Sequence, residues 1–307
     1  MQLHNAGFSV AFLGSARMVD AVNQNGLVLE YPDHAPDRPL QDSFSPKELY
    51  FTTDPNCCEK ADLIIITAKS LVTEVLSQQI KPHLQSTTSL LTLQNGVSNV
   101  GALKEAFPDI PIHGGMVTFN VIERSVPYKS PVVFRLTTRG EIFLEQSTPS
   151  LLPVFHKAGC TVQEHEHIDA ILWSKLLLNL INPLNALSGL PLKENLENRA
   201  FRLRWAACMR EGLAVLKAAG IRPAKVTPLP PHLLPFMISL PNWFYLTLAK
   251  KMTDMDPMAT SSMAQDLTKG KATEIDYLSG EIVQLGRKVG VATPENEKVY
   301  AAVKSLS

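Results

Sequence analysis

The sequence predicts an α/β domain built on a parallel sheet, followed by a domain made of α-helices. In the first half of the chain, short β-branched runs alternate with segments of helical pattern, which is typical of a parallel sheet covered by helices. After Asp169 the strand-like runs stop, and long segments with helical spacing replace them. We place the boundary near residue 166, which gives domains of residues 1–166 and 167–307.

Composition narrows the class of protein. The 307 residues are 45% hydrophobic and 19% charged, and the formal net charge is zero. This balance is typical of a soluble enzyme and gives no electrostatic reason to expect nucleic acid or an anionic membrane as a partner. The four cysteines form no C-x-x-C pair, and no basic segment followed by an apolar run opens the chain. We therefore expect a cytoplasmic protein with no signal peptide and no membrane span.

The first domain is expected to begin with the end of a helix that Gly7 terminates. The continuous β-branched run at residues 61–67 is the pattern of a strand covered on both faces. The other elements expected in order are strands at 9–13, 48–53 and 88–93, helices at 71–80 and 150–158, and two or three strands within 112–145.

Three polar side chains follow strands of this predicted sheet. Arg17 lies in the loop expected at residues 14–17 after the strand at 9–13, Lys69 follows 61–67, and Asn95 follows 88–93. Ligands of such sheets lie beyond the carboxyl ends of the strands, so these three residues are candidates for ligand binding.

The second domain begins with an apolar helix that carries a polar stripe. At roughly 100° per residue, Lys175, Asn179 and Asn182 fall within about 60° of one another, and the rest of the surface is apolar. Burying an amine and two amides costs free energy unless they find hydrogen-bonding partners. The stripe therefore indicates a site. Alternatively, surface loops or water supply the hydrogen bonds of these three side chains. Because Pro183 has no N–H, a kink near Asn179 is expected. The helices expected here are 169–188, 194–219, 231–252, 257–269 and 273–289.

A second polar group lies in the last two of these helices. Asp256-Pro257 is a good helix start, which places Ser262 in the second turn. Residues 273–276 fit a capping box, which places Glu274 in the first turn of the last helix. Alternatively, Glu274 is there only because a carboxylate suits the helix dipole.

Taken together, these motifs resemble those of the ketopantoate reductases (2-dehydropantoate 2-reductases), over nearly the whole chain. The resemblance implies a Rossmann-like, NADP-binding domain over residues 1–166 and a helical substrate and catalytic domain over 167–307. It implies reduction of 2-dehydropantoate to (R)-pantoate with NADPH, a step of pantothenate and coenzyme A synthesis. The motifs are Trp173-x-Lys175-x-x-x-Asn179-x-x-Asn182-Pro183, Ser261-Ser262-Met263-Ala264-Gln265-Asp266, Thr273-Glu274-Ile275-Asp276 and Gln94-Asn95-Gly96.

The resemblance also assigns roles to residues. Lys175 matches the general acid: hydride transfer to the ketone leaves an alkoxide, which an ammonium stabilises and protonates. Glu274 matches a carboxylate near the cofactor and the substrate hydroxyl, and Asn95 matches an asparagine between nicotinamide and substrate. The positions that match substrate-binding residues are Asn179, Asn182 and Ser262.

The cofactor is expected to be NADP(H). An NAD enzyme shows an acid for the ribose hydroxyls after the strand at 9–13, but no acid lies between Val10 and Arg17. An arginine there suits a 2′-phosphate; the alternative is a solvated surface arginine. Lys69, Asn95 and Glu274 complete the expected cofactor contacts.

Some features depart from the family pattern. The family begins with a strand and a Gly-x-Gly-x-x-Gly turn, and this chain shows neither. We expect roughly 20 residues of this unit to be absent, with a gap in the sheet between the strands at 9–13 and 61–67 and weak cofactor binding. The spacing of Asn179 and Asn182 is also shorter than in many relatives. The alternatives are therefore an inactive relative or interaction module, or a reductase of a different 2-keto acid.

Two further signals carry little weight. His165-x-His167 lacks the ligands that would complete a metal site, so exposed histidines and no metal are expected. The aromatic run Trp243-Phe244-Tyr245 indicates packing or a dimer contact. We expect a monomer or homodimer that acts on a small molecule.

Overall fold

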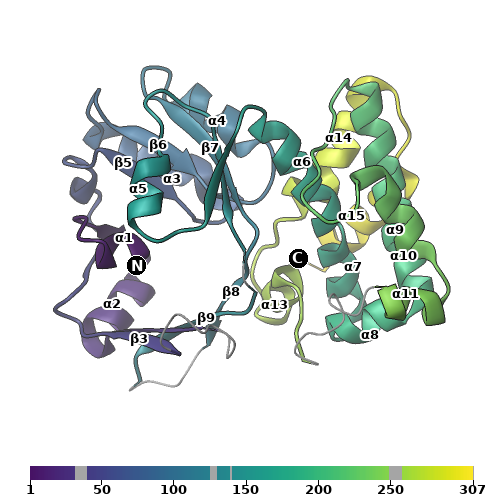
Figure 1. The fold of residues 1–307 in the computed structure, drawn as a ribbon, viewed down its shortest axis with the longest axis horizontal. Helices are drawn as coiled ribbons and strands as arrows, with labels where there is room; N and C mark the ends of the chain where they lie inside the picture. Colours follow the sequence, from purple (N-terminus) through teal and green to yellow (C-terminus); the bar gives the residue numbers. More distant parts are fainter. Residues whose placement is uncertain (32–39, 125–129, 139, 249–257, 307) are drawn as a thin grey trace. The chain divides into compact units, whose positions relative to one another are not determined.

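A computed structural model describes residues 1–31, 40–124, 130–138, 140–248 and 258–306 (Figure 1). The chain divides into two compact units, which are described separately here. The first comprises Met1–Ala68, Val72–Gln94 and Val100–Ile168, and the second comprises Lys69–Leu71, Asn95–Asn99 and Asp169–Ser307. Two short segments from the first half of the chain therefore belong to the second unit.

The main sheet of the first unit has the strand order β11-β10-β7-β6-β5. The strands β5, β6 and β7 are parallel, β10 runs antiparallel to β7, and β11 is parallel to β10. This arrangement confirms the predicted α/β class. The bounds are β5 (Leu63–Ile66), β6 (Ser89–Thr92), β7 (Ile112–Val117), β10 (Ile142–Glu145) and β11 (Val162–His165).

Helices cover both faces of this sheet. Leu90 and Leu91 are adjacent in β6 and fully buried on opposite faces, because successive side chains of a strand alternate. Leu90 packs in a cluster with Ile80 of α3 (Thr73–Ile80) and Leu103 of α4 (Asn99–Ala106). Leu91 packs in a cluster with Phe155 of α5 (Leu152–Lys157). The continuous apolar runs of the sequence thus correspond to strands buried on both sides.

Smaller sheets complete the first unit. One pairs β1 (Ala11–Leu13) with β4 (Tyr50–Thr52) in parallel, and the other has the order β3-β2-β9-β8. Since β1 and β5 lie in different sheets among the described residues, the strands are interrupted where the sequence predicted a gap. The strands of the second sheet are β2 (Leu27–Glu30), β3 (Gln41–Phe44), β8 (Val121–Arg124) and β9 (Val132–Leu136).

Several expectations for the first unit were wrong in detail. Arg17 lies inside α2 (Ala16–Asn25), with Ser15 at its N-cap position, rather than in a loop. The region 112–145 holds β7, β8, β9 and β10 instead of two or three strands, and β11 was not predicted. In β11 only Val162 is buried, and its sequence lacks the apolar run that marks β5 and β6.

The described part of the second unit is helical from α6 onward, as predicted. The core includes Leu176, Leu177, Met209 and Ile282. None of the described helices is both long and apolar enough to cross a membrane. The helices are α6 (Ile168–Asn179), α7 (Ile181–Ser188), α8 (Leu192–Glu197), α9 (Arg199–Ala218), α10 (Leu234–Ser239), α11 (Asn242–Leu248), α13 (Ser262–Thr268), α14 (Ser279–Val289) and α15 (Pro294–Lys304), with 3-10 turns η4 (Pro231–Leu233) and η5 (Ile275–Tyr277).

The helix expected over 169–188 is broken in two at Leu180. Pro183 lies in α7 and has no N–H to donate to the carbonyl of Asn179, so the helix cannot continue with regular bonding there. The break separates Asn179, at the end of α6, from Asn182, in the first turn of α7. The helix expected over 273–289 is present as the turn η5 followed by α14, and α15 after it was not predicted.

Candidate active site

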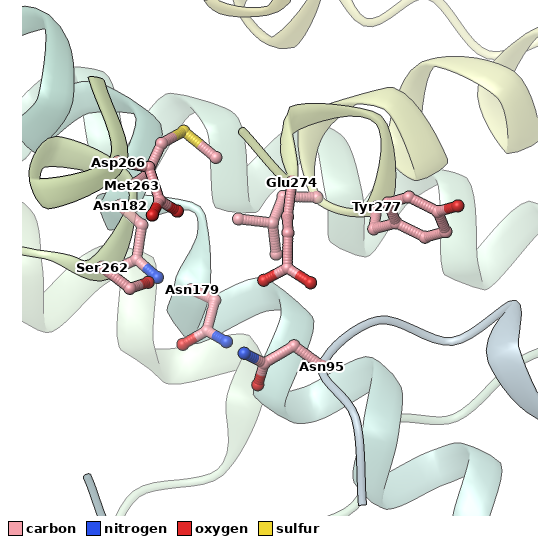
Figure 2. A pocket seen from close by; sticks show the side chains of 9 residues that line it. Asn95, Asn179, Asn182, Ser262, Met263, Asp266, Glu274 and Tyr277 are labelled. Atoms are coloured by element: carbon pink, nitrogen blue, oxygen red, sulfur yellow. The ribbon is translucent and has the colours of Figure 1, made fainter. Parts of the chain in front are cut away.

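A pocket lies within the second unit (Figure 2). Its walls come from the 95–99 segment, α6, α7, α13 and the turn around η5. Figure 2 shows the amides of Asn95 and Asn179 and the carboxylate of Glu274 directed into the same space. The lining residues are Asn95, Asn179, Asn182, Ser262, Met263, Asp266, Glu274, Tyr277 and Leu278.

The structure thus brings together five of the residues predicted from the sequence: Asn95, Asn179, Asn182, Ser262 and Glu274. They come from three regions of the chain that are more than 70 residues apart in sequence. Their amides and hydroxyl are neutral hydrogen-bonding groups that suit a carboxylate and a hydroxyl of a ligand. The roles of the individual residues stay predictions.

Lys175 lies on α6 one turn before Asn179, and the described residues that line the pocket do not include it. It is half-buried, and the residues beside it in sequence, such as Leu176 and Leu177, are buried. Burial disfavours the ammonium and lowers the pKa of Lys175 from 10.5 to about 8. An amine with such a pKa gives up a proton far more readily than an ordinary lysine.

Helix α13 begins later than predicted. Ser261 is its N-cap, with Oγ accepting from the Ala264 N–H at 3.2 Å, so Ser262 lies in the first turn and not the second. Asp256 and Pro257, the predicted helix start, lie outside the described residues. Ser261 Oγ also donates to the Asn182 carbonyl at 3.1 Å. The N-cap residue of α13 thereby connects this helix to α7, which carries Asn182.

Glu274 does not lie in the first turn of the last helix, as the capping-box pattern predicted. It precedes η5, and α14 begins only at Ser279. Its Oε1 instead accepts a hydrogen bond from the backbone N–H of Ser70 at 2.8 Å. Asp276, in the same turn, accepts from Tyr300 Oη at 2.7 Å, which anchors the turn to α15. The position of Glu274 is therefore set by distant segments and not by its own helix.

Lys69 forms an ion pair with Asp266, whose side chain lines the pocket. The Lys69 side chain is 43% exposed and that of Asp266 is 12% exposed. The pair offsets one of the two carboxylates of the pocket lining. Asp266 was not predicted as a site residue, because its partner Lys69 is 197 residues away in sequence and a single carboxylate on a helix gives no local sign of such a contact.

Arg17 lies in the first unit and is 63% exposed. Its guanidinium donates two hydrogen bonds to the carboxylate of Glu123 in β8, at 2.9 and 3.0 Å. A phosphate can compete for such a fork because an exposed ion pair contributes little free energy. In the described parts of the chain, no three His, Cys, Asp or Glu side chains gather as a metal site requires.

Comparison with known families decides the class of protein. Residues 1–148 match the family model described as ketopantoate reductase PanE/ApbA, and residues 167–307 match the model of its C-terminal domain. The chain belongs to the ketopantoate reductase family. This is a family of oxidoreductases, and the predicted family and fold class are confirmed.

Individual members of the ketopantoate reductase family are distant relatives. The 2-dehydropantoate 2-reductase of Vibrio cholerae is 29% identical over 80% of this chain and 78% of its own length. That of Pyrococcus abyssi is 26% identical over 98% of this chain and 91% of its own length. A crystal structure of a PanE/ApbA family ketopantoate reductase from Ralstonia eutropha has a TM-score of 0.82 and 27% identity, covering 99% of this chain and 92% of its own.

Other structures share only the fold. The complex of D-mandelate dehydrogenase with NADH and anilino(oxo)acetate has a TM-score of 0.78, at 21% identity, and covers 99% of this chain and 92% of its own. Structures with this fold therefore include proteins that are named for different substrates.

Proposed function

We propose that this protein reduces 2-dehydropantoate to (R)-pantoate with NADPH. The observation that carries the proposal is the convergence of Asn95, Asn179, Asn182, Ser262 and Glu274 on one pocket. These are the residues for which the family resemblance implies contact with the keto acid or the nicotinamide. The names of the Vibrio cholerae and Pyrococcus abyssi relatives support the choice of substrate.

Lys175 is the proton donor in this proposal. A nicotinamide cofactor, when bound, supplies the hydride to the ketone carbon, and negative charge develops on the ketone oxygen. The Lys175 ammonium stabilises that charge and then transfers a proton to the oxygen. Its pKa of about 8 leaves it mostly protonated at neutral pH, yet acidic enough to protonate an alkoxide without a large barrier.

The polar lining binds and orients the keto acid. Asn179, Asn182 and Ser262 supply N–H and O–H donors for its carboxylate and hydroxyl. Glu274 accepts from the substrate hydroxyl, and the backbone N–H of Ser70 holds its carboxylate in place. Fixing the ketone against the hydride donor lowers the barrier by removing orientational freedom before reaction.

The residues expected to contact the cofactor have side chains that suit NADP(H). The exposed guanidinium of Arg17 suits a 2′-phosphate, which would replace the carboxylate of Glu123 as its partner. Lys69 carries a second, part-exposed ammonium, and Asn95 and Glu274 would contact the nicotinamide end. The 2′-phosphate is the group that distinguishes NADPH from NADH, so Arg17 is the expected discriminator.

A panel of 2-keto acids tests the proposal. The oxidation of NADPH, and in parallel of NADH, is followed with the full chain and each acid in turn. We expect 2-dehydropantoate with NADPH to give the highest kcat/KM. Clear turnover of another 2-keto acid and none of 2-dehydropantoate would assign a different substrate. No turnover of any acid, by protein shown to be folded, would support an inactive relative or interaction module instead.

A further inference from the structure

Two buried polar residues outside the predicted site lie next to the pocket. Ser70 is 1% exposed and Asn99 is 3% exposed. They belong to the short segments Lys69–Leu71 and Asn95–Asn99 of the second unit, which follow β5 and β6 in sequence. Burial of two polar side chains requires hydrogen-bonding partners. Here the two side chains bond to each other and to the carbonyl of Asn95, a residue that lines the pocket.

The carbonyl oxygen of Asn95 accepts hydrogen bonds from both residues. Ser70 Oγ donates to it at 2.8 Å, and Asn99 Nδ2 donates to it at 2.6 Å. Asn99 Nδ2 also donates to Ser70 Oγ at 3.0 Å, which closes the network. With its carbonyl held from two sides, the peptide group of Asn95 cannot rotate without breaking buried hydrogen bonds.

The same network reaches the carboxylate of the pocket. The backbone N–H of Ser70 donates to Glu274 Oε1 at 2.8 Å, so Ser70 contacts Glu274 with its backbone and Asn95 with its side chain. A hydrogen bond to an ionised carboxylate is stronger than one between neutral groups. Asn95 and Glu274 are thereby linked through one intermediate residue.

Close packing fixes the other side of the loop. Gly96 has φ of +90°, a left-handed conformation that side chains rarely adopt. A Cβ at Gly96 would lie 3.3 Å from Tyr277 Cβ and 3.5 Å from Asn99 Nδ2. The loop therefore passes tightly between the η5 turn and the Ser70–Asn99 pair, and its conformation depends on both.

We propose that Ser70 and Asn99 are positioning residues that set the Asn95 amide and the Glu274 carboxylate in the pocket. The inference deepens the reductase proposal and rests on it for its effect on turnover. Neither residue contacts the substrate in this scheme. Their side chains act on Asn95, whereas Ser70 holds Glu274 with its backbone N–H, which an alanine at position 70 keeps. The contribution of each side chain to the rate therefore depends on the Asn95 side chain being present.

Kinetics of Ser70→Ala, Asn99→Ala and Asn95→Ala, singly and in pairs, test this dependence. With the keto acid that the full chain turns over best, we expect Ser70→Ala and Asn99→Ala each to lower kcat about 10-fold, the scale of a small misplacement of reacting groups. Their double variant should lose little more than either single variant, since both act on one carbonyl. In the Asn95→Ala background, Asn99→Ala should change kcat less than about 2-fold.

Thr88→Val is the matched control. Thr88 is fully buried in the first unit, and its hydroxyl donates to the Ala61 carbonyl at 2.9 Å. The control should lower the Tm but leave kcat unchanged. If Ser70→Ala and Asn99→Ala instead multiply in the double variant and keep their full effect without the Asn95 side chain, they are structural residues and the proposal is wrong.

Hydrogen exchange separates this proposal from the proposed function. In Asn99→Ala, amides in the 69–71 and 95–99 segments should exchange at least about 10-fold faster, whereas Thr88→Val should leave them unchanged. If the full chain reduces no 2-keto acid, the proposed function fails, and this exchange result alone decides whether the network holds the loop. Unchanged exchange in both Asn99→Ala and Ser70→Ala would overturn the proposal.

Discussion

At the scale of a single residue, burial changes the acidity of the Lys175 amine. A buried ammonium has lost part of its hydration, so proton release from Lys175 is easier than from a solvated lysine. Lys175 lies on the apolar helix α6, one turn before Asn179, which lines the pocket. The residue that is costly to bury is thus the one to which we assign proton transfer.

Replacing Lys175 tests that assignment. Lys175→Ala should lower kcat by about 10³-fold, since it removes both proton donation and stabilisation of the alkoxide. In the unchanged protein, kcat/KM should fall as the pH rises through about 8, where the amine of the free enzyme loses its proton. The variant should lack this fall. Lys217→Ala, on an exposed site of α9, is the control and should keep full activity; a similar rate for both variants would remove Lys175 from the mechanism.

Arg17 is the second residue with a separable role. Arg17→Ala should raise the Kd for NADPH about 10-fold or more and leave that for NADH nearly unchanged, because only NADPH carries the 2′-phosphate. Binding measured by titration, without turnover, gives both constants. Arg124→Ala, which removes another exposed arginine of the first unit that pairs with Glu30, should affect neither. Equal losses for both cofactors would contradict a phosphate contact.

At the scale of elements, helix ends shape the pocket. The break between α6 and α7 and the N-cap of α13 meet at Asn182, whose carbonyl accepts from Ser261. Ser261 also receives a hydrogen bond from its own helix, and its backbone N–H donates to Asn185 Oδ1 at 2.8 Å. An N-cap that elsewhere only stabilises a helix here also sets the position of Ser262 relative to Asn182.

Two N-cap variants distinguish these effects. Ser261→Ala and Asn198→Ala each remove a side-chain cap, of α13 and α9 respectively, and each should cost about 1 kcal/mol of stability. Only Ser261→Ala should also raise the KM for the keto acid, because only this cap contacts pocket backbone. Thermal unfolding and steady-state kinetics of both proteins measure the two effects. An equal KM in both variants would show that the cap has no influence on the site.

At the scale of the whole molecule, burial of Lys175 affects the pH dependence of folding. Its pKa is about 8 in the folded protein, against an ordinary value of 10.5 that applies to an unfolded chain. Between these values the unfolded chain binds the proton more tightly, so stability rises with pH across this window. Below pH 8 the full penalty of a buried ammonium is present.

Lys175→Met should therefore be more stable than the unchanged protein at pH 7, since it keeps the long apolar stem and removes the charge. The difference in Tm should shrink as the pH rises from about 8 to about 10. Lys217→Met, at an exposed position, should show no such trend. A methionine variant that is less stable at pH 7 would mean that the ammonium is well compensated in the folded state.

Local patterns in the sequence were sufficient for the architecture and for part of the site. The apolar runs at β5 and β6 and the apolar helix at α6 are signals carried by neighbouring residues, and the structure contains all three. Elements with few buried apolar residues, such as α2 and β11, were not predicted because their patterns are weak. The stripe of polar residues on α6 pointed to Asn179 because helical geometry is itself local.

Only the tertiary structure decided how the remaining groups meet. Ser70 and Glu274 are 204 residues apart in sequence, and Lys69 and Asp266 are 197 apart, yet each pair is hydrogen-bonded. No periodicity relates such positions, since their contact depends on how distant segments fold together. The sequence by itself determined the two-part architecture and most of the polar groups of the pocket. Their partners were determined by packing between segments that share no local pattern.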